Sequence, residues 1–215
     1  MEVLEKYQKE LARRKYSPRT IYTYSCCITK FISFTNKEIR KITKEDVYSY
    51  LDKIKNKSGS TINVNLQAIK FLLEEILNKR KTFYDIKYSK APRSLPEVLS
   101  KQEIYSLITS IKNDKHSLII RLMYSAGLRV SELLNLKVRD MNIDNNFGWV
   151  RKGKGNKDRI FIIAKSLKGE IQKLVDKGNL NDNDNLFAGY KKSPLSSKTV
   201  YAIVKKAGKA AKIKK

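Results

Sequence analysis

Between Ile86 and Leu99 the chain shows no helical or strand period of apolar residues, and this gap favours folds built from two separate parts. The gap holds two of the chain's four prolines, Pro92 and Pro96. Proline lacks a backbone N–H and is disfavoured inside helices and central strands, so we expect a linker here. The predicted division is a first domain at residues 1–85, a basic linker at 86–99 and a second domain at 100–215.

The first part predicts a compact unit of helices. An amphipathic helix begins near Leu4, and a second begins at Ser17, which can cap it, with Pro18 at the first helical position. Thr43 starts a third. A fourth carries apolar residues spaced four, three, four and three positions apart, at Ile62, Leu66, Ile69, Leu73 and Ile76.

The second part predicts helices and two short strands. Ser100 and Glu103 form a capping box, Asp114 is expected to cap the next helix, and Gly127 interrupts it before a third. Strands are expected at 147–150 and 159–163 around a basic turn, followed by a helix at 166–177. A last helix is expected to bury one face, formed by Val200, Ile203, Val204 and Ala207. The fold class is therefore mainly α with a small β-sheet.

The charge of the chain indicates a polyanionic partner. It carries 46 Lys and Arg against 21 Asp and Glu, a formal net charge of +25. Such an excess repels itself in a folded protein, so nucleic acid is the first candidate partner and an anionic membrane surface the second. The basic residues run along the whole chain, which favours a folded basic surface over a tail. The alternative is a lysine-rich surface that reflects a biased genome.

Other features limit the class of protein. No apolar run reaches the roughly 18 residues of a membrane span, and the N-terminus is too charged for a signal peptide, so a soluble, cytoplasmic protein is expected. The two cysteines, Cys26 and Cys27, are neighbours and cannot join distant segments. No metal-binding pattern is present in the sequence, and we expect neither a metal nor a cofactor.

The first candidate site motif is the segment Gly127–Leu134. Gly127 lets the chain turn between two helices, and Arg129 then stands where a helix begins, an environment that favours anions. A planar guanidinium offers two parallel donors to phosphate oxygens. Glu132, three residues on, is close enough to orient Arg129. The alternative is an ordinary surface ion pair.

The second motif is Gly153–Arg159, between the two expected strands. Glycines flank Lys154 at the tip of a hairpin, which makes it a mobile cation able to reach a phosphate ester. The segment is not a Walker loop, because the Gly-Lys-Ser/Thr sequence is missing and strands flank it. The alternative is a basic hairpin that contacts a backbone without chemistry.

Together these motifs resemble the tyrosine recombinases of the phage integrase type, and most closely the Xer group with its archaeal members. The resemblance covers the whole chain: Ser17–Thr20 resembles the start of the family's core-binding domain, and Pro194–Val200 a late helix of its catalytic domain. It implies a four-helix, SAM-like core-binding domain followed by a mostly helical α+β catalytic domain that is truncated at its C-terminus.

The resemblance also implies a chemistry. In this family a tyrosine attacks the scissile phosphate, arginines stabilise the transition state and a hairpin lysine protonates the leaving 5′-hydroxyl, without metal or ATP. By position, Arg129 matches the first arginine, Lys154 the hairpin lysine and Glu132 a supporting acidic residue. Contacts to double-stranded DNA are expected from basic residues in both domains and the linker, namely Arg19, Lys90, Arg93, Lys152, Lys157, Arg159 and Lys198.

The remaining family motifs are not found in residues 1–215. The single histidine, His116, precedes Arg129 and cannot belong to the later His-x-x-Arg motif, and Tyr201 lies upstream of where the nucleophile should be. We therefore expect a truncated recombinase that binds DNA without cutting it. Family members form tetramers on paired sites, whereas this chain is expected to be a monomer. A stand-alone DNA-binding protein with the same fold is the alternative, and an RNA-binding protein a third possibility.

Overall fold

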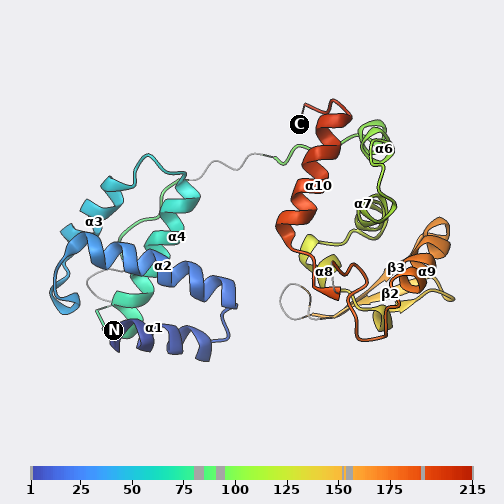
Figure 1. Cartoon of the computed structure of the whole chain (residues 1–215). Helices are drawn as coiled ribbons and strands as arrows, with labels where there is room; N and C mark the ends of the chain where they lie inside the picture. Colours follow the sequence, from blue (N-terminus) through green and yellow to red (C-terminus); the bar gives the residue numbers. More distant parts are fainter. Residues whose placement is uncertain are drawn as a thin grey trace. The chain divides into compact units, whose positions relative to one another are not determined.

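The computed structural model describes residues 2–79, 85–90, 95–151, 153, 157–189 and 192–214. The chain forms two compact units, residues 1–95 and residues 96–215 (Figure 1). Each unit has a hydrophobic core of its own. The fold is mainly α with one small sheet, as the sequence predicts.

Helices alone make up the first unit among the described residues. They are α1 (Glu2–Arg13), α2 (Pro18–Thr35), α3 (Lys44–Lys53) and α4 (Gly59–Lys70), with a short 3-10 turn η1 (Ile39–Lys41). The start of α2 is the predicted one, since Ser17 Oγ accepts the Thr20 N–H at 3.1 Å. The core is mostly apolar and includes two tyrosines whose hydroxyls have partners. The Tyr7 hydroxyl donates to the Ala68 carbonyl at 3.1 Å, and that of Tyr50 donates to the buried Asn65 Oδ1 at 3.2 Å. Burial raises the pKa of Tyr7.

The end of α4 differs from the expected single helix. The α-helix stops at Lys70, and a π-helical turn, η2 (Phe71–Ile76), continues it. A π turn holds more residues than an α turn, which lets the consecutive side chains of Phe71, Leu72 and Leu73 all be buried. The apolar stripe from Ile62 to Ile76 is therefore present, but its last part follows a wider helix.

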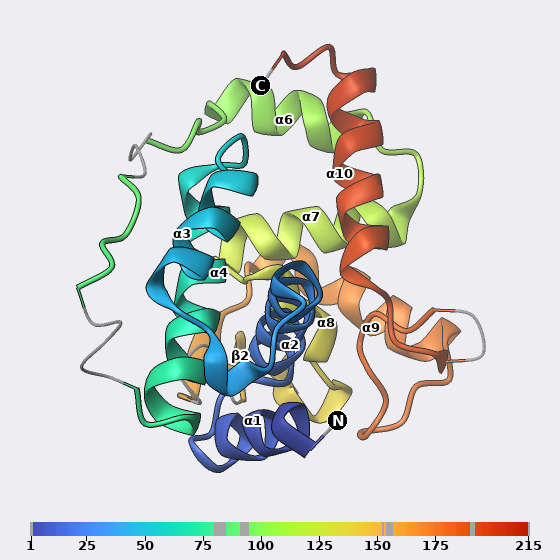
Figure 2. The same ribbon diagram turned by 90° about the vertical axis from the view of Figure 1, so that its left-hand side faces the viewer.

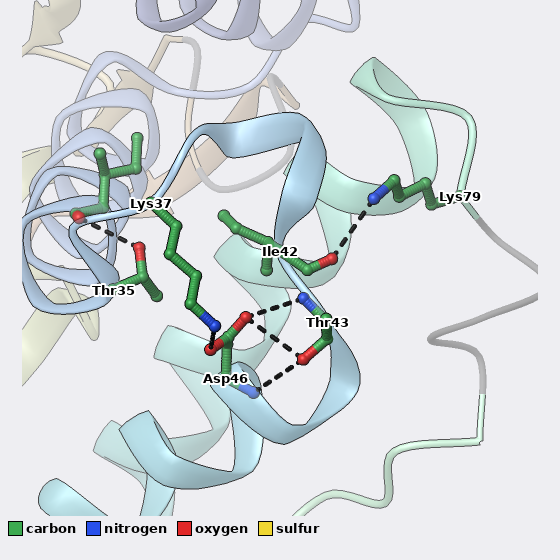
Figure 3. A network of polar contacts seen from close by, with 7 residues as sticks. Thr35, Lys37, Ile42, Thr43, Asp46 and Lys79 are labelled. Atoms are coloured by element: carbon green, nitrogen blue, oxygen red, sulfur yellow. Dashed lines mark hydrogen bonds and ion pairs between the residues drawn. The ribbon is translucent and has the colours of Figure 1, made fainter.

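A polar network fixes the start of α3 (Figure 3). The Thr43 N–H donates to Asp46 Oδ2 at 2.9 Å, and the Asp46 N–H donates to Thr43 Oγ1 at 3.4 Å, which closes a capping box. Lys37 Nζ donates to Asp46 Oδ1 at 2.7 Å. Lys79 Nζ donates to the Ile42 carbonyl at 3.3 Å and so joins the chain after η2 to this corner.

Replacing Asp46 by alanine removes the carboxylate half of the capping box and the partner of Lys37, while Thr43 Oγ1 can still accept the backbone N–H of residue 46. We expect Asp46→Ala to lower the free energy of unfolding of the first unit by about 1 kcal/mol, the order of one capping hydrogen bond at a helix start. Circular dichroism at 222 nm during urea unfolding measures the loss. Asp52→Ala is the matched control, because Asp52 is exposed on the same helix without a side-chain partner among the described residues. Equal effects of both changes would contradict the capping role.

The second unit contains five α-helices among the described residues, α6 (Lys101–Thr109), α7 (Asp114–Ala126), α8 (Val130–Asn135), α9 (Lys168–Lys177) and α10 (Ser197–Ala210). Two 3-10 turns, η3 (Val138–Asp140) and η4 (Lys165–Leu167), connect elements. The helix α10 lies beside α6 in both Figure 1 and Figure 2 and also contacts α8. These contacts bury Val200, Ile203 and Ala207 in the core.

A three-stranded antiparallel sheet completes this unit. Its order is β1 (Met141–Asn142), β2 (Phe147–Val150) and β3 (Arg159–Ile162), with Gly148 opposite Phe161. A Cβ on Gly148 would lie 2.3 Å from Phe161 Cζ, so only glycine lets that ring pack into the core. The sequence predicts β2 and β3 but not β1.

Two expectations in this unit were wrong in detail. The cap of α7 is Asn113, which accepts the His116 N–H at 3.0 Å, and Asp114 is the first helical residue. Both residue types cap well, so the one-residue difference is invisible in the sequence. Val204 is 37% exposed, because it lies at the edge of the face that buries Ile203 and Ala207.

Candidate functional site

A glycine turn places Arg129. Gly127 ends α7 in the left-handed region, at φ 59°, a conformation that glycine adopts without the strain other residues meet. The next residue, Leu128, is 5% exposed and anchors the turn in the core. Arg129 therefore stands directly before α8, with its side chain 58% exposed.

Glu132 is a buried carboxylate that binds two arginines. Its side chain is 4% exposed. Oε1 accepts Arg129 Nη1 at 2.7 Å, and Oε2 accepts the backbone N–H of Arg129 at 3.1 Å and Arg159 Nη2 at 2.9 Å. The expected pairing of Arg129 with Glu132 is thus present. The contact with Arg159, which comes from β3, was not expected.

These contacts control the ionisation of Glu132. Burial by itself raises the pKa of this carboxyl, but hydrogen bonds from the backbone and guanidinium of Arg129 and from Arg159 outweigh it, and the pKa falls to about 2. Glu132 is therefore ionised at neutral pH. Its charge offsets the two neighbouring guanidinium charges only in part, so the cluster keeps a net positive charge suited to an anion.

A second buried carboxylate holds the other strand of the hairpin. Asp140 is 4% exposed, and its Oδ1 accepts Arg151 Nε at 2.7 Å, just after β2 ends. Arg159 begins β3 on the facing strand and is held by Glu132. Both strands are thus fixed by an Arg–carboxylate pair. Sequence reasoning did not single out Asp140, whose only local signal is the capping-box spacing from Lys137.

The predicted DNA-contacting residues divide into three groups. Four of them are exposed, and their side chains have no hydrogen-bond or ion-pair partner within the described residues: Arg19 on α2, Lys198 on α10, and Lys90 and Lys157 outside the helices and strands. Arg159 is half-buried and already bonded to protein oxygens. Arg93 and Lys152 lie outside the described residues, as does Lys154, which was predicted as the catalytic lysine of the hairpin.

Lys198 belongs to the same part of the second unit as Arg129. Residues at the start of α8, including Val130 and Ser131, line one pocket together with Leu195 and Ser197, where α10 begins. The start of α10 thus lies close to the residues that follow Arg129. In contrast, α9 packs against α7 and η4.

The described ranges contain neither a cluster of metal-ligating side chains nor a membrane-spanning helix. No group of three or more His, Cys, Asp or Glu side chains there could hold a metal ion. No helix in the same ranges is long and apolar enough to cross a membrane.

Comparison with solved structures identifies the fold. A lambda integrase dimer bound to a COC′ core site is similar over 100% of this chain and 82% of that chain, with a TM-score of 0.76 and 18% identity. The two helical units, with the small sheet in the second, therefore form the fold of an integrase-type recombinase.

Sequence comparison then gives the family. Residues 97–215 match the phage integrase family and residues 3–82 the N-terminal SAM-like domain of phage integrases. Tyrosine recombinase XerA of Pyrococcus horikoshii is 36% identical over 216 residues, 97% of this chain and 73% of the relative. XerA of Pyrococcus furiosus is 37% identical over 221 residues, 99% of this chain and 75% of the relative. The chain belongs to the phage integrase family of tyrosine recombinases, which supports a role in site-specific DNA recombination.

Proposed function

We propose that this chain binds duplex DNA at a recombination site and places Arg129 against a backbone phosphate. The observation that carries the proposal is the exposed guanidinium of Arg129, which the buried Glu132 holds at one edge. Within the described residues, only Nη1 of this guanidinium has a hydrogen-bond partner, so its remaining donors can serve an anion. The net charge of +25 and the DNA-bound lambda integrase of the same fold support the choice of DNA.

In the strand cleavage of this family, Arg129 and Lys154 would act on one phosphate. Attack of a hydroxyl on phosphorus increases the charge on the non-bridging oxygens, and a fixed guanidinium stabilises that charge more than the ground state. The ammonium group of Lys154 would give a proton to the leaving 5′-oxygen as the P–O bond breaks. Glu132 would keep Arg129 oriented without contacting the DNA.

We also propose that residues 1–215 alone bind DNA without cleaving it. After Arg129 the sequence contains no histidine, and hence no His-x-x-Arg motif, and its last tyrosine is Tyr201. Tyr201 is 67% exposed on α10, where Lys205 Nζ lies 5.8 Å from its ring centroid. Without DNA the chain would be a monomer, since its charge opposes self-association.

A nicked suicide substrate tests the proposal that residues 1–215 bind DNA without cleaving it. Incubated with the 215-residue chain, a duplex of this kind should shift in a native gel but give no band that survives denaturation. Tyr201→Phe is the control and should behave like the original chain. A covalent adduct that the Tyr201→Phe change abolishes would contradict the proposal and identify Tyr201 as the nucleophile. No shift at all would contradict DNA binding.

A further inference from the structure

Arg159 links the start of β3 to both parts of the Arg129 site. Its Nη2 donates to the Gly127 carbonyl at 3.1 Å and to Glu132 Oε2 at 2.9 Å. Gly127 forms the turn that places Arg129, and Glu132 holds its guanidinium. One nitrogen of Arg159 therefore contacts the two features that determine where Arg129 points.

The contact with Oε2 has a specific consequence for Glu132. The last torsion of a glutamate side chain is broad, so a buried carboxylate needs donors on both oxygens to keep one orientation. Oε1 is held by Arg129 itself. Oε2 is held by Arg159 and by the longer backbone contact of Arg129, at 3.1 Å. Loss of Arg159 would leave Oε2 with the longer backbone contact alone, which weakens the restraint on the carboxylate and on the guanidinium that it holds.

The hairpin between β2 and β3 also lies close to the carboxylate of Glu132. The Gly153 N–H donates to the Lys157 carbonyl at 3.0 Å, which joins the two chains of the hairpin beyond the strands. A Cβ on Gly153 would lie 2.9 Å from that carbonyl oxygen and 3.5 Å from Glu132 Oε1. The backbone at Gly153 is therefore close to Glu132, and Lys154 is the next residue in the sequence.

We propose that Arg159 is a positioning residue, which acts through Glu132 to fix Arg129 and ties the hairpin that carries Lys154 to the same carboxylate. The proposal rests on the proposed function, in which Arg129 contacts a phosphate. It assigns Arg159 a role inside the protein in place of the direct DNA contact expected from its charge.

The first test measures the Arg129 guanidinium by NMR in the free 215-residue chain. In the original protein its Nη hydrogens should give separate, slowly exchanging signals, because Glu132 restricts rotation of the group. Arg159→Gln should merge these signals and speed their exchange with water. Arg159→Lys should restore part of the restriction, since one ammonium can still reach Glu132.

Arg151→Gln is the matched control. Arg151 is anchored to the buried Asp140 on the other strand of the same hairpin and has no contact with Glu132 among the described residues. A general loosening of the hairpin would affect Arg129 equally in both variants, whereas positioning through Glu132 predicts unchanged Arg129 signals in Arg151→Gln. Fluorescence of Trp149, the only tryptophan, monitors folding of each variant.

The second test is a double-mutant cycle on duplex DNA affinity. Arg159→Gln should weaken binding about fivefold in the original chain but less than about twofold when Arg129 is already alanine, the non-additivity of coupled residues. Unchanged Arg129 signals in Arg159→Gln, equal changes in Arg151→Gln, or additive losses in the cycle would overturn the proposal. If Arg129→Ala leaves affinity unchanged, the phosphate contact of the proposed function fails, and the NMR result still decides the role of Arg159.

Discussion

Raising the salt concentration from about 50 mM to about 200 mM should weaken duplex DNA binding by this chain about a thousandfold, the change expected for a protein that neutralises roughly six phosphates. The physical cause is the release of counterions from DNA as lysine and arginine replace them. The chain has a net charge of +25, and Arg19, Lys90, Lys157 and Lys198 are exposed without side-chain partners among the described residues. Fluorescence anisotropy with a labelled duplex over a salt series measures the slope.

A single substitution should change that slope by a fixed amount. Lys198→Ala removes a cation from the start of α10, close to the part of α8 that follows Arg129, and should reduce the slope of log Kd against log salt by about one. Lys173→Ala is the matched control on α9, which packs against α7 and η4, and should leave the slope unchanged. A Kd nearly independent of salt would contradict backbone binding. Equal effects of both variants would contradict the placement of Lys198 at the interface.

The parts of the fold that were predicted correctly depend largely on contacts between residues close together in the sequence. Helix starts at Ser17, Thr43 and Ser100 depend on side-chain contacts within three residues, and each cap is found in the structure. The strand β1 was missed because its two residues are defined by pairing with β2 and not by their own pattern. The π turn at the end of α4 was missed for a similar reason, since tertiary packing selects it over an α turn of the same composition.

In the candidate site, too, the contact between residues close in sequence was predicted and the contact between distant residues was missed. The pair of Arg129 and Glu132 is separated by three residues on one helical turn, and spacing alone predicts it. The contact between Glu132 and Arg159 joins α8 to the start of β3, two elements whose contacting residues are 27 positions apart. No local pattern encodes such a contact, so the charge of Arg159 suggested DNA as its partner. The role of Lys154 stays a prediction from its motif.

The buried carboxylate of Glu132 gives the second large prediction, a loss of stability that depends on pH. Its pKa is about 2 in the folded chain against an ordinary value of 4.5, so the ionised form stabilises the fold. This contribution is complete above pH 5 and disappears as the pH falls to about 2, and its size is on the order of 3 kcal/mol. Glu132→Gln should therefore lower the free energy of unfolding of the second unit by about 3 kcal/mol at pH 7 and by almost nothing near pH 2.

Urea unfolding followed by Trp149 fluorescence at several pH values measures this difference, because that tryptophan lies in the second unit. Glu103→Gln is the matched control. Glu103 occupies the same capping-box position on α6, where its Oε2 accepts the Ser100 N–H at 2.7 Å, and glutamine fulfils that role nearly as well. Other carboxylates titrate in both proteins and cancel in the difference. A Glu132→Gln deficit that stays constant from pH 7 to pH 2 would mean that the side chain matters for its shape and hydrogen bonds, and that its charge does not hold the two arginines.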